Sequence, residues 1–82
     1  MGEVIMVYRI MPNPEKLDSV KRGLERLRPV RIEEEPIAFG LVALNVTIRM
    51  PDEGGIQDEI EERIRNIDGV DSMELITFTR AM

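Results

Sequence analysis

Two segments of the sequence carry a narrow apolar stripe at helical spacing, and this feature limits the chain to few folds. In each segment apolar residues recur three or four positions apart, with mostly charged residues between them. The stripes consist of Leu17, Val20, Leu24 and Leu27 in the first segment and of Ile56, Ile60, Ile64 and Ile67 in the second. A helix with one apolar side covers one face of one layer, so both helices are expected to pack on a single sheet.

The ends of both helices are also marked in the sequence. Asn13 can cap the first helix, Pro14 suits the first helical position, and Pro29 is expected to end it. In the second helix, Asp68 and Gly69 are the expected stop. We therefore expect helices over residues 13–29 and 56–67.

Two strands flank the first helix. Residues 3–11 form an unbroken apolar run rich in valine and isoleucine that ends at Pro12, which is typical of a central strand. Residues 30–35 alternate between apolar and charged side chains, which suits a half-exposed strand at the edge of a sheet.

Two further strands flank the second helix. Residues 40–50 alternate clearly, and residues 51–55 are a loop by composition. Residues 70–82 form the last strand, whose alternation is imperfect. Either a bulge near Leu75 and Ile76 or apolar contacts on both faces would explain this pattern.

The order strand, helix, strand, strand, helix, strand predicts an α+β fold. It is the ferredoxin-like βαββαβ sandwich, with a four-stranded antiparallel sheet and two helices on one face. Right-handed crossovers put the first and last strands side by side or one strand apart. A chain of 82 residues has room for one core, so we expect a single domain over residues 1–82.

Composition excludes several classes of function. The net charge of −5 disfavours direct binding of nucleic acid, and no stretch is apolar enough to span a membrane. The chain has no histidine to activate Ser19 or Ser72 and no cysteine for a thiolate site. We expect a cytoplasmic domain with no covalent catalytic residue, no metal site and no cofactor; self-association is left open.

The acidic run Glu33, Glu34 and Glu35 has two interpretations. It is either a solvated edge strand or an acidic edge that faces a partner with a basic patch. The charged residues of the second helix, by contrast, include Glu59 with Arg63 at the spacing of exposed helical ion pairs, which indicates a solvated face.

Two short motifs remain as candidate contact points. In "PIAFG", Pro36 fixes the approach to a bend, Phe39 stands at the bend and Gly40 frees the exit. Phe39 is either exposed for a partner or tucked under the loop as core. In "FTRAM", Arg80 follows Phe78 close to the end of the chain, where it either reaches outward or protects the sheet edge from pairing.

The segment "EEEPIAFGLVALNVTIRMPDEGG" resembles the elongation factor 1-beta family, in its archaeal members and in the C-terminal exchange domain of the eukaryotic beta and delta subunits. "DSMELITFTRA" is similar to the last strand of that domain. The resemblance covers the whole chain. It implies a translation elongation factor that promotes exchange of GDP for GTP on the GTPase elongation factor 1-alpha.

The resemblance also implies roles for the two motifs. Phe39 matches a phenylalanine that packs into a pocket on the GTPase, and Arg80 falls where eukaryotic members have a lysine that enters the magnesium site. Arginine is broader and less strongly hydrated than lysine, so the chain departs from the eukaryotic pattern at this position. The partner-binding residues are then Phe39, Gly40, Pro36, Arg80, Phe78, Glu34 and Glu35.

Two other functions are compatible with the same fold. The first is an ACT-like module that binds a small molecule or regulates, and dimerises through its sheet. The second is an acylphosphatase-like hydrolase, which needs a phosphate-cradling loop after the first strand. Arg9 precedes that bend, but no glycine-rich cradle follows it, which argues against a hydrolase of this kind.

Overall fold

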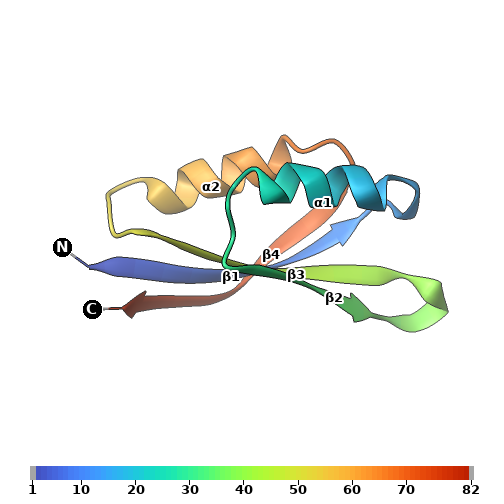
Figure 1. Cartoon of the computed structure of the whole chain (residues 1–82), viewed down its shortest axis with the longest axis horizontal. Helices are drawn as coiled ribbons and strands as arrows, with labels where there is room; N and C mark the ends of the chain where they lie inside the picture. Colours follow the sequence, from blue (N-terminus) through green and yellow to red (C-terminus); the bar gives the residue numbers. More distant parts are fainter. Residues whose placement is uncertain (1, 82) are drawn as a thin grey trace.

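The computed structural model describes residues 2–81 and has the expected order of elements. The elements are β1 (Glu3–Pro12), the 3₁₀ turn η1 (Pro14–Lys16), α1 (Leu17–Glu25), β2 (Arg31–Pro36), the turn η2 (Ala38–Gly40), β3 (Val42–Pro51), α2 (Ile56–Arg65) and β4 (Val70–Ala81). Figure 1 shows both helices in one layer above a single sheet. The prediction of a ferredoxin-like α+β sandwich is confirmed. The last expected strand residue, Met82, lies outside the described part.

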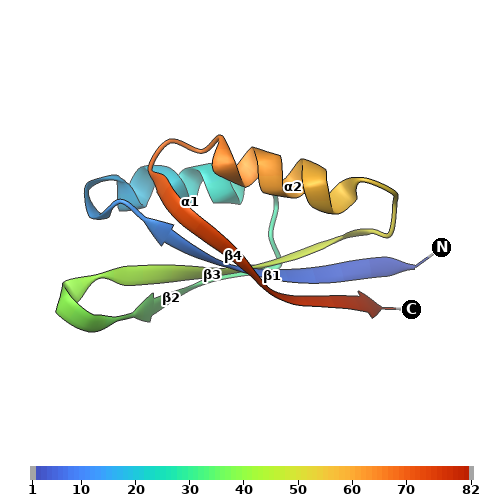
Figure 2. The ribbon, with the colours of Figure 1, turned by 180° about the vertical axis from the view of Figure 1, so that it is seen from behind.

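The sheet has the strand order β2-β3-β1-β4, and all three pairings are antiparallel. β1 is central and lies directly beside β4, as the crossover rule allowed. β2 is an edge strand, as its charges indicated. β4 is the other edge strand, and in the view from behind it lies in front of the other strands, with both helices above the sheet (Figure 2).

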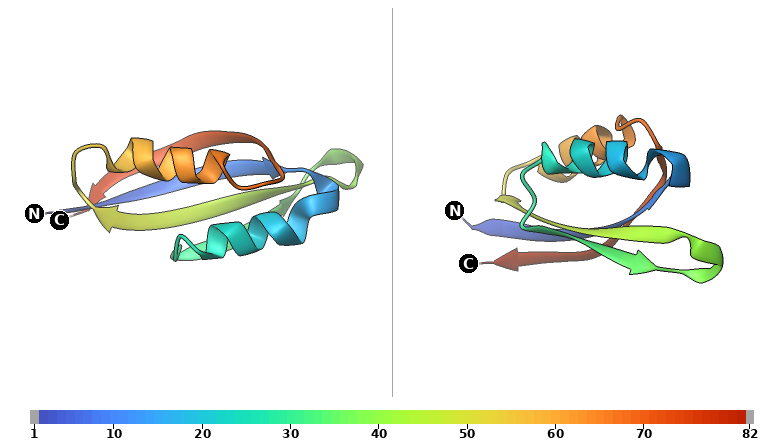
Figure 3. Two further views of the ribbon diagram at one scale, coloured as in Figure 1. Left: turned by 90° about the horizontal axis from the view of Figure 1, so that it is seen from above. Right: turned by 45° about the vertical axis from the view of Figure 1, so that its right-hand side comes forward.

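The core lies between the sheet and the two helices (Figure 3). Alternate residues of β1 are fully buried against the helices, and so are the facing positions of β3 and the stripes of α1 and α2. These residues are Val4, Met6, Tyr8, Ile10, Leu44, Val46, Ile48, Val20, Leu24, Ile60 and Ile64. Each such side chain stabilises the fold by about 1.5–3 kcal/mol relative to exposure, so the stripes account for the position of both helices.

A bulge in β4 explains the imperfect alternation of the last strand. Val7 lies opposite Thr77 and Tyr8 lies opposite Leu75, so Ile76 is the extra residue between them. The extra residue shifts the alternation by one position. As a result Leu75 before the bulge and Phe78 after it both lie on the side that faces the helices.

Both helices are shorter than expected. The Asn13 side chain caps as predicted, accepting the N–H of Glu15 at 3.0 Å, but it caps η1, and the α-helix begins only at Leu17. α2 ends at Arg65 because the Ile67 N–H turns back to the Ile64 carbonyl (3.1 Å) and tightens the chain before the expected stop. Neither helix is long and apolar enough to cross a membrane.

Tyr8 is the one core side chain with a polar end. Its hydroxyl donates to Glu61 Oε2 (3.1 Å), and the Gln57 amide donates to the same oxygen (2.9 Å). Burial, followed by the charge and the hydrogen bond of Glu61, raises the pKa of Tyr8 above its ordinary value of 10.0. The folded protein therefore holds the phenol proton more tightly than the unfolded chain does.

This difference predicts a loss of stability at high pH. Above about pH 10 the unfolded chain releases the Tyr8 proton and the folded protein keeps it, so the free energy of unfolding falls as pH rises. Tyr8→Phe is expected to lower the stability at pH 7 by about 1–2 kcal/mol and to make the fall above pH 10 shallower. Urea unfolding of both proteins between pH 7 and 11 measures this. Equal slopes would show that the Tyr8–Glu61 contact does not control the titration.

Candidate functional site

The turn between β2 and β3 presents Phe39 to solvent. The Leu41 N–H reaches back to the Ala38 carbonyl (3.4 Å), and the two residues between them both have positive φ, 64° for Phe39 and 74° for Gly40. This is the pattern of a tight hairpin turn, in which asparagine and glycine are the preferred residues. Phe39 is 98% exposed, so the interpretation of this side chain as core is wrong.

Phe39 is therefore unfavourable in two ways. A phenylalanine with positive φ costs about 1–3 kcal/mol, and an exposed ring gains nothing from burial. Leu41 beside it is also partly exposed, at 38%. A strained, exposed aromatic residue at a turn is the kind of outlier from which a contact with a partner is inferred.

Arg80 lies inside β4, opposite Val4 of β1. Its Nε–H donates to Asp52 Oδ2 (3.0 Å), and its guanidinium carbon lies 5.4 Å from the centre of the Phe78 ring. The strand pairing continues to this position, so the backbone of Arg80 is held in the sheet. The side chain is still 70% exposed, so its guanidinium is accessible.

The acidic residues of β2 are already paired within the chain. Glu34 accepts a hydrogen bond from Lys21 of α1, and this bond raises the pKa of Lys21 above its ordinary value. Glu35 lies on the other side of the strand, where it accepts from the Asn45 amide (3.1 Å) and is 3.7 Å from Arg9. Successive residues of a strand point to opposite faces, so these two carboxylates do not form one acidic surface.

Pro36 ends β2 opposite Val42, which places it at the base of the Phe39 turn. The structure therefore brings Pro36, Phe39 and Gly40 together. Arg80 and Phe78 lie elsewhere: Val4 pairs with both Arg80 and Met50, so they sit at the end of β3 that is far from the turn. In Figure 1 the turn and the chain termini are at opposite ends of a molecule that measures 43 × 21 × 17 Å.

Asp52 is the residue of this arrangement that the sequence did not single out. It follows β3, and Arg80 is in β4; they meet only because both strands flank β1. The spacing of residues along the chain does not indicate that Asp52 and Arg80 are neighbours in space. Within residues 2–81, no group of three or more acidic side chains is placed to hold a metal ion.

The family model described as the EF-1 guanine nucleotide exchange domain matches residues 5–81, which is nearly the whole chain. The chain belongs to this family. The resemblance of the segments "EEEPIAFGLVALNVTIRMPDEGG" and "DSMELITFTRA" to the exchange domain is therefore confirmed at the level of the family.

Relatives from several archaea support the same assignment. Elongation factor 1-beta of Methanoculleus marisnigri is 40% identical over 82 residues, which cover 96% of this chain and 98% of the relative. That of Methanothermobacter thermautotrophicus is 36% identical over 89 residues and covers both chains fully. That of Pyrobaculum aerophilum is 40% identical over 87 residues, with 96% and 95% covered.

Membership of the EF-1 exchange family assigns the chain a role as a nucleotide exchange factor in translation elongation. The family does not favour the ACT-like module. In this setting Phe39 and Arg80 are two exposed side chains of different chemistry, an aromatic ring and a guanidinium, held at the two ends of one sheet.

Proposed function

We propose that this chain acts as a single exchange module that releases guanine nucleotide from elongation factor 1-alpha, in the cytoplasm, where elongation takes place. The family match over residues 5–81 carries the proposal. The sequence contains no histidine or cysteine, and exchange by binding requires neither. The module works by differential binding and forms no covalent intermediate.

The thermodynamic basis is the linkage between two ligands of one GTPase. A protein that binds the nucleotide-free form more tightly than the GDP-bound form weakens GDP binding by the same factor. For about every 1.4 kcal/mol by which the factor prefers the nucleotide-free form, the affinity of the GTPase for GDP falls about tenfold. The exchange factor therefore needs contacts that form only when the nucleotide site is distorted.

Phe39 is the proposed anchor. Its ring is solvated in the free protein, so docking into an apolar pocket removes nearly all of its surface from water. Buried aromatic anchors at interfaces contribute about 2–4 kcal/mol. Pro36 lies at the base of the turn and Gly40 lies within it, and both keep its backbone in the conformation that projects the ring.

Arg80 is the proposed competitor for the magnesium site of the GTPase. The guanidinium packs over the Phe78 ring, and its hydrogen bond to Asp52 orients it. An exposed ion pair of this kind contributes at most about 1 kcal/mol, so Arg80 can leave Asp52 for a stronger anionic site. Glu34 and Glu35 contribute to partner binding only if Lys21 and Arg9 release them, which makes them the weaker contacts.

The test of the proposal is the dwell time of a fluorescent GDP analogue on elongation factor 1-alpha. Adding this protein is expected to shorten the dwell time in a concentration-dependent manner, without hydrolysis of the nucleotide. If the release rate reaches its plateau at the same protein concentration at which complex formation is complete, binding drives release. An unchanged dwell time at concentrations where the two proteins form a complex would refute the function.

Arg80→Ala is expected to slow GDP release by about tenfold while complex formation with the GTPase changes little, because the guanidinium acts on the ion site and the anchor lies elsewhere. Arg80→Lys, which keeps the charge, should restore part of the rate. Stopped-flow release and a pull-down at equal protein concentrations separate the two effects. If GDP release and binding to the GTPase fell together, Arg80 would be a binding contact like Phe39 and would not act on the ion site.

A further inference from the structure

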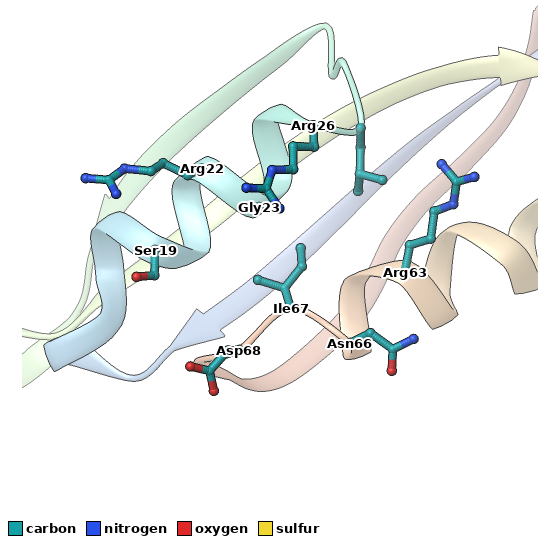
Figure 4. A pocket seen from close by; sticks show the side chains of 9 residues that line it. Ser19, Arg22, Gly23, Arg26, Arg63, Asn66, Ile67 and Asp68 are labelled. Atoms are coloured by element: carbon teal, nitrogen blue, oxygen red, sulfur yellow. The ribbon is translucent and has the colours of Figure 1, made fainter.

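A groove along the seam between α1 and α2 lies on the outer side of the helical layer. Its volume is about 550 Å³, which is within the range of small-molecule sites. It is lined by Ser19, Arg22, Gly23, Arg26, Leu27, Arg63, Asn66, Ile67 and Asp68. Figure 4 shows Ile67 between the helices, with Arg22 and Arg26 on the α1 side and Arg63 on the α2 side.

Two of the three arginines that line this groove differ from most basic residues of the described chain. Ion pairs within residues 2–81 engage Arg9, Lys16, Lys21, Arg31, Arg49, Arg63, Arg65 and Arg80. Arg22, Arg26 and Arg28 form none in the same range. Two of these three line the groove, in a chain whose net charge is −5. Their charge is therefore available to an external anion.

The one carboxylate that lines the groove does not cancel this charge. Asp68 binds the Lys16 ammonium through both oxygens, at 3.0 and 2.9 Å. The floor is apolar, and it is narrow because Gly23 lets Ile67 approach: a Cβ at position 23 would lie 2.7 Å from Ile67 Cγ2. Guanidinium groups over an apolar floor suit a ligand that carries phosphate on a small body.

We propose that this groove binds a compact polyphosphate, such as the phosphate chain of a nucleotide or free polyphosphate. A compact anion meets the arginines locally, whereas an extended nucleic acid would meet the negative charge of the whole chain. Figure 4 shows the three guanidinium groups pointing in different directions. Because they are exposed, the anion can draw them together, and the ordering of long side chains keeps the affinity modest.

This site is independent of the exchange function, because it lies on the helical layer and its test needs no GTPase. The experiment is a titration of the isotopically labelled full chain with sodium tripolyphosphate and with GTP at low ionic strength, followed by amide chemical shifts. Saturable changes are expected in residues 19–27 and 63–68. Stronger binding of GTP than of tripolyphosphate would identify a nucleotide as the ligand. Equal binding would show that the groove recognises the phosphate chain alone.

The matched variants test the assignment to the arginines. Arg22→Gln with Arg26→Gln is expected to weaken binding about tenfold. Arg31→Gln with Arg65→Gln removes the same charge outside the groove and should leave the affinity nearly unchanged. Equal weakening in both variants, shifts spread over all basic residues, absence of saturation in the wild type, or tighter binding of a single-stranded RNA at equal phosphate concentration would each overturn the proposal.

Discussion

Phe39→Ala is expected to reduce the acceleration of GDP release on the order of 100-fold and to leave the thermal midpoint nearly unchanged. The ring is 98% exposed, so its removal leaves no cavity in the core. Under the proposed role, the ring contributes only to the complex with the GTPase, where docking would remove it from water. Fluorescent GDP release and thermal unfolding, measured on the same preparation, give both quantities.

Two further variants sharpen this test. Phe39→Asn keeps the turn, since asparagine tolerates positive φ, and is expected to raise stability by up to about 1 kcal/mol while exchange is lost. Val30→Ala truncates another exposed apolar side chain, 61% accessible, and should retain full exchange. A marked drop in the thermal midpoint of Phe39→Ala, or full activity of Phe39→Asn, would contradict the role of the ring.

Of the proposed substitutions, Gly69→Ala is expected to lower the free energy of unfolding most, by about 2–5 kcal/mol. Gly69 has φ 102°, a conformation that alanine adopts only with strain. An added Cβ would lie 2.7 Å from Lys16 Cβ and 2.9 Å from Val20 Cγ2. Val20 is fully buried and cannot move aside, and the Gly69 carbonyl accepts the Asn13 N–H at 2.7 Å, which holds the turn in place.

Chemical denaturation measures this loss, which corresponds to a fall in the thermal midpoint of at least about 10 °C for a domain of this size. Gly54→Ala is the matched control, because Gly54 is exposed and an added Cβ there meets nothing within 4 Å. It should unfold within about 0.5 kcal/mol of the wild type. If both variants were equally stable, the turn at Gly69 would be free to rearrange.

The architecture was largely predictable because each element has a strong periodic signal. The stripe that contains Ile60 and Ile64 and the alternation through Leu44 and Val46 allow only one buried side each, and the structure buries those sides. The helix ends were less predictable. They depend on backbone bonds such as that from the Ile67 N–H to the Ile64 carbonyl, which the side-chain pattern does not specify.

The residues of the candidate site were predictable from the sequence, but their exposure and contacts were predictable only in part. The sequence singled out Phe39 and left its exposure open, since a bend allows the ring to point either way; the φ of 64° and the exposure decide it. The contact between Arg80 and Asp52 depends on the order of strands, and the separation of Glu34 from Glu35 depends on the direction of each side chain. Such information is spatial, and a linear pattern does not contain it.

The position of β1 in the middle of the sheet has a kinetic consequence. Pro12 pairs with Val70 and Glu3 pairs with Ala81, so this ladder joins segments from opposite ends of the chain. Closing so long a loop costs entropy before any contact compensates for it, and folding rates fall as contacts become less local. Refolding is therefore expected to take milliseconds or longer, with the β1–β4 ladder among the last parts to form.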